Sequence, residues 1–342
     1  MTPDAVEKRL TAGSGLVDRL RREPKLYLYG PAALMATYLV VMRVGTGAIR
    51  PVQLGVTALV LALCYWSDAT RALFKGLFPF LVFAIVYDAM HITEPLVRFL
   101  HVHIATPYHF DKALFGIHTA QGVLTPNEFF ALHHWPAVDL LTGTSYIVYV
   151  YWAFGLAIYL ALFRKEPAMK QLLVRYGWVF CAVNLAAFAT YYIYPAAPPW
   201  YAAHYGFGTP DFAHIAASPA AAIRWDQLTG LHYFQGFYGQ SADIFGAIPS
   251  LHVAYPLMVF IYGRYVRNLA FNIANFLFYL LVCFSAVYLQ HHYILDVMLG
   301  TTYALVAFGI ERAVTHAIER RRRQRRDTPG TPPAIDQAVG AR

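Results

Sequence analysis

The chain has 342 residues, of which 58% are hydrophobic and only 13% are charged, and its formal net charge is +8. A soluble globular domain carries about 25% charged residues, so this chain lacks the polar side chains that would cover a water-facing surface. With a mean hydropathy of +0.42 and a pI of 9.3, the composition excludes a cytosolic enzyme, a disordered chain and a soluble nucleic-acid-binding protein. It indicates an integral membrane protein.

A transmembrane helix needs about 20 mostly apolar residues, and stretches of about this length recur along the chain with few or no charges. Lys75 near the start of the third stretch can extend its amine toward the interface, and Asp296 and Gly300 interrupt the last apolar run. The predicted helices cover residues 26–42, 51–67, 72–90, 140–163, 176–194, 244–263, 268–295 and 297–310. We therefore predict an all-α fold, a polytopic membrane helix bundle with about eight transmembrane helices.

The orientation follows from Lys and Arg, which accumulate on the cytoplasmic side of membrane proteins. With eight spans and a cytoplasmic amino terminus, 22 of the 27 Lys and Arg residues fall on cytoplasmic segments. This topology places both termini in the cytoplasm. It places the two long polar segments, 91–139 and 195–243, on the extracytoplasmic face, which is periplasmic or lumenal.

Four regions follow from this pattern. Residues 1–25 form a basic cytoplasmic tail, and residues 26–134 contain the N-terminal transmembrane helices and an amphipathic segment at the outer face. Residues 135–316 form the predicted catalytic core, and residues 317–342 form a second basic tail that we expect to be disordered. The arginines of this tail favour contact with anionic lipid headgroups over nucleic acid.

The first candidate functional cluster is the segment from Gly246 to His252, at the outer end of the sixth predicted helix. Pro249 suits the first turn of a helix, where backbone N–H groups lack intrahelical partners. These N–H groups and the positive end of the helix dipole favour a bound anion. Ser250 adds a hydroxyl group there, and His252 adds a proton donor.

The second cluster contains His291, His292, Tyr293 and Asp296. His292 and Asp296 are four residues apart, so they lie on one face of a helix. A carboxylate bonded to one ring nitrogen fixes the imidazole tautomer and makes the other nitrogen more nucleophilic. The alternative interpretation is that the histidines of both clusters are interfacial side chains that only pair with their neighbours. Two such motifs on the same side of the membrane favour catalysis.

These motifs resemble those of a known family. Pro249-Ser250-Leu251-His252 and His292-x-x-x-Asp296 are similar to two motifs of the phosphatidic acid phosphatase type 2 superfamily. The resemblance to fungal inositol phosphorylceramide synthases is closer, because the chain also has Tyr194-Pro-Ala-Ala-Pro-Pro-Trp-Tyr201 and Ala217-Ser-Pro-Ala220. It covers residues 135–305 and implies a phosphatidic acid phosphatase type 2-like catalytic core.

The resemblance also implies roles for individual residues. It makes His292 the nucleophile, Asp296 its orienting carboxylate and His252 the acid–base residue. We expect the substrate to be bound by further residues: Ser250, Arg224, His291, Tyr293, Pro198 and Trp200.

The chain departs from the superfamily pattern at Ala286, where an arginine is expected six residues before the nucleophilic histidine. A phosphomonoester dianion needs several cations, and arginine suits phosphate best. The missing cation therefore favours a phosphodiester substrate. Arg224 is the only basic residue between 176 and 263 and is the candidate for the remaining phosphate contact, although it would equally serve as a membrane anchor.

The leading hypothesis is a lipid phosphotransferase that moves phosphoinositol from phosphatidylinositol to a ceramide-like or other lipid alcohol. It needs a phospholipid donor, a lipid-alcohol acceptor and the membrane, but no cofactor, metal or nucleic acid. The alternatives are a lipid phosphatase acting on a phosphatidate or polyprenyl phosphate, and a non-catalytic transporter or scaffold. The sequence gives no indication of an oligomeric state.

Two further groups of residues have open roles. His101, His103, His109, His118, His133 and His134 would suit a zinc or haem site, but no Cys or closely spaced carboxylate completes a ligand set. Asp111, Asp139, Asp226 and Asp243 are candidates to bind a polyol such as inositol.

Overall fold

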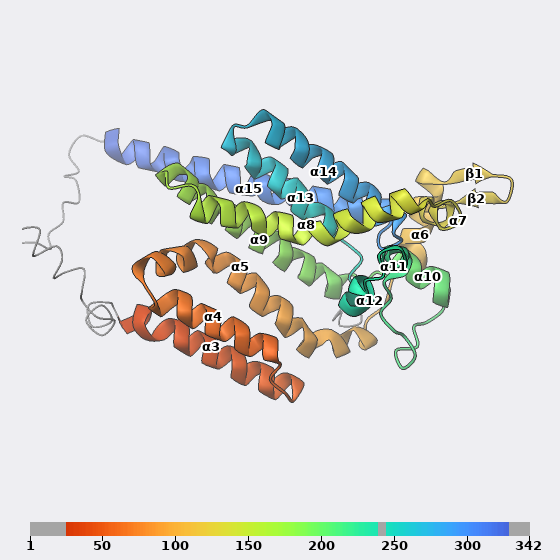
Figure 1. Cartoon of the computed structure of the whole chain (residues 1–342), viewed down its shortest axis with the longest axis horizontal. Coiled ribbons are helices and arrows are strands. Elements are labelled where there is room, and N and C mark those ends of the chain that lie inside the picture. Colours follow the sequence, from red (N-terminus) through yellow and green to blue (C-terminus); the bar gives the residue numbers. More distant parts are fainter. Residues whose placement is uncertain (1–24, 239–243, 328–342) are drawn as a thin grey trace, which may run out of the picture.

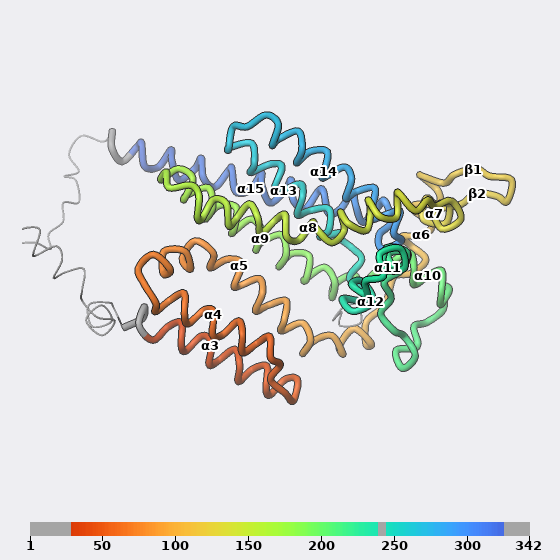
Figure 2. Tube along the Cα trace, in the orientation of Figure 1, coloured from red at the N-terminus to blue at the C-terminus, as the bar shows by residue number. Residues whose placement is uncertain are grey.

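The computed structural model describes residues 25–238 and 244–327 of the chain. Long helices run along the long axis of the molecule, and short helices and a two-stranded sheet gather at one end (Figure 1). The described chain starts at Lys25 and stops at Asp327. The first and the last coloured segments of the tube lie at the opposite end (Figure 2).

The first three long helices form one side of the molecule. They are α3 (Lys25–Thr46), α4 (Pro51–Tyr65) and α5 (Asp68–Thr93), and a short 3₁₀ helix, η1 (Glu94–Phe99), follows them. Ser67 caps α5, because its hydroxyl oxygen accepts a hydrogen bond of 3.1 Å from the backbone N–H of Thr70. Apolar side chains from α3 and α4, among them Met35, Met42 and Val60, pack into a small core of their own.

The remaining long helices form a bundle against α5. They are α8 (Pro136–Leu162), α9 (Pro167–Ile193), α13 (Leu251–Gly263), α14 (Leu269–Tyr288) and α15 (Ile294–Asp327), and η3 (Arg264–Val266) follows α13. Fully buried aromatic residues such as Tyr176, Phe180 and Tyr262 fill their core. The ring centroids of Phe80 on α5 and Phe180 on α9 lie 4.9 Å apart, so the same core joins α5 to the bundle.

Each of the eight predicted stretches contains or overlaps one of these eight long helices. Five helices, α5, α8, α9, α14 and α15, are long and apolar enough to cross a membrane. The all-α membrane fold is confirmed, but the number of eight spans is not. The 13 residues of α13 extend for only about 20 Å, against a hydrocarbon core of about 30 Å.

Two predicted boundaries are wrong for an identifiable reason. The stretch 244–263 becomes helical only at Leu251, because residues 245–247 bond through their backbone to another loop. The stretch 268–295 does not form one helix, since α14 ends at Tyr288 and α15 begins at Ile294. The turn between them contains the histidine motif.

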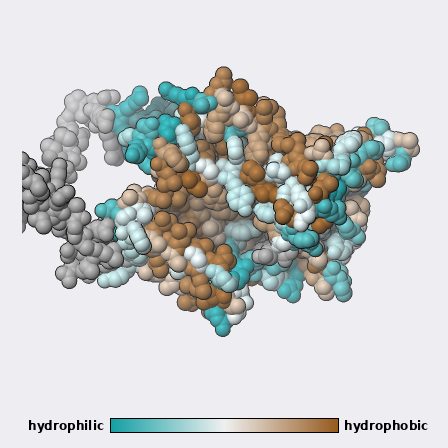
Figure 3. All heavy atoms as spheres, viewed as in Figure 1, coloured by the Kyte–Doolittle hydropathy of each residue, from teal (hydrophilic) through white to brown (hydrophobic). Residues whose placement is uncertain are grey.

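The two segments predicted to lie outside the membrane form the compact end of the molecule. Segment 91–139 contributes α6 (Ala105–Phe115), a hairpin of β1 (Ile117–Thr119) and β2 (Gly122–Leu124), and α7 (Pro126–Leu132). The hairpin pairs Ile117 with Leu124 and Thr119 with Gly122. Segment 195–243 contributes α10 (Pro199–Tyr205), η2 (Ala220–Ala222), α11 (Ile223–Thr229) and α12 (Tyr233–Tyr238). Hydrophilic residues concentrate at this end and at the far end, and apolar residues cover the helical body between them (Figure 3).

Three loops meet side by side at the compact end. Ala196 forms parallel backbone bridges with His103 on one side and with Gly246 on the other. The N–H of His103 donates to the carbonyl of Pro195 at 2.8 Å, and the N–H of Ala196 donates to the carbonyl of Phe245 at 2.8 Å. These bonds hold the proline-tryptophan motif beside the segment that leads into α13.

Candidate active site

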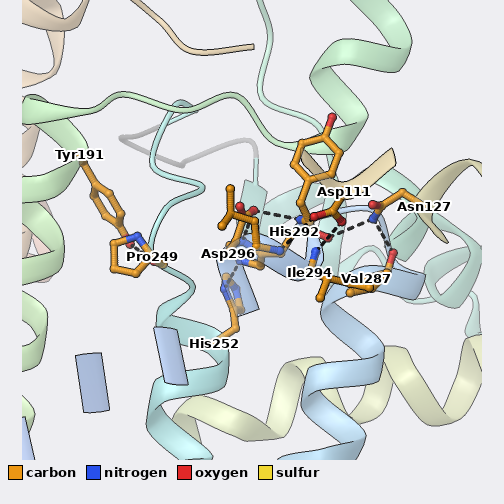
Figure 4. A network of polar contacts seen from close by, with 11 residues as sticks. Asp111, Asn127, Tyr191, Pro249, His252, Val287, His292, Ile294 and Asp296 are labelled. Atoms are coloured by element: carbon orange, nitrogen blue, oxygen red, sulfur yellow. Dashed lines mark hydrogen bonds and ion pairs between the residues drawn. The ribbon is translucent and has the colours of Figure 1, made fainter. Parts of the chain in front are cut away.

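His252, His292 and Asp296 form a continuous chain of contacts where α13 meets the start of α15 (Figure 4). The Nδ1 atom of His292 lies 3.3 Å from Oδ2 of Asp296, and its Nε2 atom lies 3.0 Å from Nδ1 of His252. The network is satisfied when Nδ1–H of His292 donates to the carboxylate and Nε2 accepts from Nδ1–H of His252. In that tautomer Nε2 of His292 carries the lone pair that a nucleophile requires. The two motifs therefore converge. This was predicted from the four-residue spacing of His292 and Asp296 and from the placement of both motifs on the same side of the membrane.

The backbone around His292 is fixed from several directions. Asp296 also accepts a hydrogen bond of 2.9 Å from the N–H of Tyr293. Asp111 on α6 accepts from the N–H groups of Ile294 and Leu295 at 2.7 and 3.0 Å. It thus supplies a carboxylate to the N-terminus of α15, where backbone donors lack partners. The side-chain amide of Asn127 on α7 donates to the carbonyl oxygen of His292 at 3.0 Å.

The close approach of α13 and α15 depends on Gly300. A Cβ atom at this position would lie 2.2 Å from the carbonyl oxygen of Ser250, so any other residue would separate the two backbones. The N–H of Ser250 donates to the carbonyl oxygen of Asp296 at 3.1 Å. Pro249 was predicted in the first helical turn, but it precedes Ser250, which is the N-cap of α13. Its carbonyl oxygen accepts from the hydroxyl of Tyr191 at 3.3 Å instead.

Aromatic rings hold the imidazoles of His252 and His291 in a stack. The ring of Tyr146 on α8 lies 4.3 Å from the ring of His252 and 5.2 Å from that of His291, nearly parallel to both. The ring of Tyr238 covers His291 at 4.5 Å. Such stacking restricts the rotation of the His252 ring.

His291 is a structural neighbour of the His252–His292 pair. Its Nε2 atom lies 3.1 Å from the carbonyl oxygen of Pro219, to which it donates. Burial, and to a smaller extent the charge of His292, lower the pKa of His291 to about 3. His291 is therefore neutral near pH 7, and it offers a phosphate no positive charge.

A cavity of about 80 Å³ opens beside these imidazoles. Five of the residues predicted for the site line it: Pro198, Trp200, His252, His291 and His292. The other lining residues are Ala217, Ser218, Tyr238, Ile244, Gly246 and Ala247, so all four motif segments contribute to one wall. Among the lining residues that the structure describes there is no Lys or Arg.

Three predicted binding residues do not line this cavity. Ser250 is fully buried, and its hydroxyl has no hydrogen-bond partner among the described residues. Tyr293 lines a different cavity, of about 140 Å³, between α7 and α10. Arg224 on α11 donates through Nε to Asp139 on α8 at 2.7 Å, and its guanidinium carbon lies 5.2 Å from the ring centroid of Tyr288.

The candidate polyol-binding aspartates have structural roles where the structure describes them. Asp111 bonds to the start of α15, and Asp139 pairs with Arg224. Asp226 accepts from the N–H groups of Phe234 and Gln235 at the start of α12. Asp243 lies outside the described residues.

The outer histidines do not assemble into a ligand set in the described part of the chain, where no three His, Cys, Asp or Glu side chains are placed to hold a metal ion. His103 stacks on Tyr194 with a centroid distance of 3.6 Å, and His133 stacks on Phe129 at 4.3 Å. These histidines pack as aromatic side chains.

Sequence reasoning missed Asn127, Tyr146 and Tyr238 altogether, although each contacts the histidine motif. No feature of the sequence distinguishes Tyr146 and Tyr238 from the other tyrosines. The chain has 25 of them, and most are expected in apolar helices. For Asn127 a weak signal existed. It follows Thr125-Pro126, a typical helix start, in a segment otherwise predicted to lie at the surface.

The fold and the paired histidine motifs define a class of membrane enzyme: the chain belongs to the PAP2 superfamily, which residues 123–310 match. Among curated proteins, it is 37% identical to the phosphoinositol dihydroceramide synthase of Bacteroides thetaiotaomicron over 278 residues, which cover 80% of this chain and 88% of that protein. It is 34% identical to the catalytic subunit of inositol phosphorylceramide synthase from Saccharomyces cerevisiae over 129 residues, which cover 37% of this chain and 31% of that subunit. The corresponding subunit of Schizosaccharomyces pombe is 29% identical over 175 residues, which cover 50% of this chain and 39% of that subunit.

No solved structure matches the chain significantly. The resemblance drawn from the motifs is confirmed by the superfamily match over residues 123–310 and by similarity over 80% of this chain.

Proposed function

We propose that the protein is an inositol phosphorylceramide synthase-like lipid phosphotransferase that moves a phosphoinositol headgroup from phosphatidylinositol to a ceramide-like alcohol. The observation that carries this proposal is the chain Asp296–His292–His252, with contacts of 3.3 and 3.0 Å, at one wall of a cavity. A relative that aligns over 80% of this chain is named phosphoinositol dihydroceramide synthase.

The proposed reaction has two steps. In the first, Nε2 of His292 attacks the phosphorus atom, the bond from phosphorus to the diacylglycerol oxygen breaks, and His252 gives that oxygen a proton. In the second, the acceptor hydroxyl gives its proton to His252 and attacks the phosphohistidine, and the P–N bond breaks. Asp296 stabilises the positive charge on His292 while the P–N bond exists. In this structure Nε2 of His292 contacts Nδ1 of His252. The phosphoryl group must therefore enter between the two rings.

The absence of Lys and Arg among the described residues that line the cavity supports a phosphodiester substrate. A diester carries one negative charge, whereas a phosphomonoester carries up to two and needs more compensating cations. Backbone N–H groups at the start of α13, where His252 lines the cavity, are the proposed partners of that single charge. Pro198 and Trp200 line the same cavity, and we place the headgroup against them.

The proposed orientation in the membrane follows from the positions of the described chain ends. Lys25 and Asp327 lie at the end of the molecule that is far from the active site (Figure 1). Arginines follow Ile318 on α15 at that end, and basic residues favour the cytoplasm. We therefore place both termini in the cytoplasm and the active site on the extracytoplasmic face.

A lipid-exchange assay tests the function. Purified protein in mixed micelles receives inositol-labelled phosphatidylinositol and one of several alcohols: a ceramide, a diacylglycerol, a sterol or none. The expected product is a labelled sphingolipid, formed together with diacylglycerol, and labelled inositol phosphate should be minor. Release of inositol phosphate at the same rate with and without ceramide would instead favour a hydrolase.

A further inference from the structure

A second cavity lies between the N-terminal helices and the catalytic bundle. It has a volume of about 640 Å³ and is lined by residues of α3, α4, α5, α8 and α12. The space-filling view shows the surface hollowed between these two parts (Figure 3). Small-molecule sites typically measure about 300–1,000 Å³, so this cavity is large enough for part of a lipid, whereas the catalytic cavity of about 80 Å³ is not.

The lining of this cavity is amphipathic. Its apolar part includes Val52, Val56, Phe83, Ile85 and Phe237. Its polar part is a cluster in which the carboxylate of Asp88 accepts from Arg50, from the hydroxyl of Tyr38 at 2.8 Å and from the amide of Gln53 at 2.7 Å. Ionisable groups between membrane helices are energetically unfavourable unless they pair, so they mark functional positions.

The charge of the polar cluster distinguishes between the two lipid substrates. Arg50 and Asp88 form an ion pair, so the cluster offers no excess positive charge to an anionic phosphodiester. It offers hydrogen bonds instead. The Nε–H of Arg50 is buried and has no partner among the described residues, and it suits a carbonyl or hydroxyl oxygen. An uncharged lipid with amide and hydroxyl groups matches these requirements.

The cavity is connected to the active site through α12. Tyr233, Gly236 and Phe237 of this short helix line the cavity. Tyr238, the next residue, lines the catalytic cavity and stacks on His291 at 4.5 Å. One helix thus separates the two cavities, and a lipid held on one side can present its hydroxyl group toward the other.

We propose that this cavity is the binding site of the lipid-alcohol acceptor, with the polar end of the lipid at the Arg50–Asp88 cluster and its chains between α3–α5 and α8. The assignment rests on the transferase function proposed above. It gives the first three helices a role in acceptor recognition.

Two cavity-filling variants test this assignment. A Cβ atom at Gly236 would meet no atom within 4 Å, so Gly236→Leu extends into open space. Ala84→Phe fills the cavity from a different helix, α5, and provides a second chance of a folded variant. Gly55→Leu is the matched control, because Gly55 is exposed on α4, does not line the cavity and also has no atom within 4 Å of an added Cβ.

Initial rates are measured with labelled phosphatidylinositol and a short-chain ceramide, each varied in turn. We expect both cavity variants to raise the KM for ceramide about ten-fold or more, since inserting a side chain into a site that must be filled typically has an effect of this size. The KM for phosphatidylinositol should change less than about two-fold, and Gly55→Leu should change neither by more than about two-fold.

An increase in the KM for phosphatidylinositol alone would assign the cavity to the donor and overturn the proposal. Unchanged values for both substrates in folded cavity variants would also overturn it and leave a cavity for bulk lipid. A wild-type protein that transfers no headgroup to any alcohol refutes the proposed function itself, and the acceptor site falls with it. If the wild type transfers the headgroup and the cavity variants have unchanged KM values, only the proposed acceptor site is refuted.

Discussion

Asp111, on the short helix α6, accepts hydrogen bonds from the N–H of Ile294, the first residue of α15, and from the N–H that follows it. The two residues are 183 positions apart. Asp111 is fully buried, so this contact holds a carboxylate in the protein interior in order to fix the start of the helix that carries Asp296. Asp111 precedes the region 123–310 that matches the superfamily, so a residue outside that region helps to fix the backbone next to His292.

The first prediction concerns this carboxylate. Burial raises the pKa of Asp111 from 3.8 to about 6, although the two backbone N–H groups oppose the shift. Because the folded-state pKa lies above the unfolded value, this group favours folding most below pH 3.8 and loses that contribution as the pH rises to about 6. We therefore compare the free energy of unfolding of the wild type with that of Asp111→Asn. The difference, wild type minus variant, should fall between about pH 4 and pH 6 and be constant above about pH 7.

Thermal unfolding in detergent, followed by circular dichroism from pH 4 to pH 8, measures this difference. Asp211→Asn is the control, because Asp211 is exposed and its carboxylate contacts only its own loop, the side chain of His214 and the N–H of Ala213. Parallel stability curves for the wild type and Asp111→Asn would contradict the prediction. At neutral pH we also expect Asp111→Ala to be less stable by about 1 kcal/mol, the usual effect of losing a helix cap.

The second prediction separates the roles of the two catalytic histidines. His292→Gln should abolish headgroup transfer and the phosphoenzyme, since it removes the proposed nucleophile. His252→Gln should slow formation of the phosphoenzyme by about 10²–10⁴-fold, the usual contribution of a general acid. Rapid-quench experiments with ³²P-labelled phosphatidylinositol measure both. Near-normal turnover by His292→Gln would show that the nucleophile is assigned wrongly.

The third prediction concerns Arg224, for which the sequence left a phosphate contact and a membrane anchor equally open and which the structure pairs with Asp139. Arg224→Gln leaves a buried carboxylate without its cation, and we expect a loss of about 3–5 kcal/mol in stability. The double variant Arg224→Gln/Asp139→Asn should regain most of it. Its KM for phosphatidylinositol should then equal that of the wild type, whereas a KM that remains high would establish that Arg224 binds the phosphate.

The fourth prediction concerns substrate charge, which the sequence connected to Ala286. Restoring an arginine at this position is not a sound test, because Ala286 is fully buried in a cluster with Tyr146, Val253 and Tyr288. A long charged side chain there would disrupt the core. Ala217 lines the catalytic cavity, so Ala217→Arg introduces the cation where a substrate can reach it.

We expect the wild type to turn over phosphatidylinositol faster than phosphatidic acid. Ala217→Arg should lower the KM for phosphatidic acid about ten- to hundred-fold, because one charge-assisted hydrogen bond contributes about 1.5–3 kcal/mol. Ala216→Arg is the control, since the neighbouring residue is exposed and does not line the cavity. A wild type that prefers phosphatidic acid would refute the diester argument and favour a phosphatase.

Much of the architecture could be predicted from the sequence because the relevant signals are local. Gaps between charges gave the positions of the long helices, and the four-residue spacing of His292 and Asp296 predicted their contact. The bridges from Ala196 to His103 and Gly246 could not be predicted. They are backbone bonds between loops that have no periodic pattern, and they explain why α13 starts at Leu251. The partners of Asp111 were equally unpredictable, since a single aspartate in a polar segment has no feature that identifies a distant helix.

The backbone bridge between His103, Ala196 and Gly246 has a practical consequence for protein dissection. A fragment trimmed to the matched region, 123–310, would lack both His103 and Asp111. The proline-tryptophan loop would lose one of the two backbone segments that bond to it, and the N–H groups at the start of α15 would lose their acceptor. Coexpression with a separate piece containing residues 1–122 should restore activity to that fragment by complementation, because these missing contacts are noncovalent.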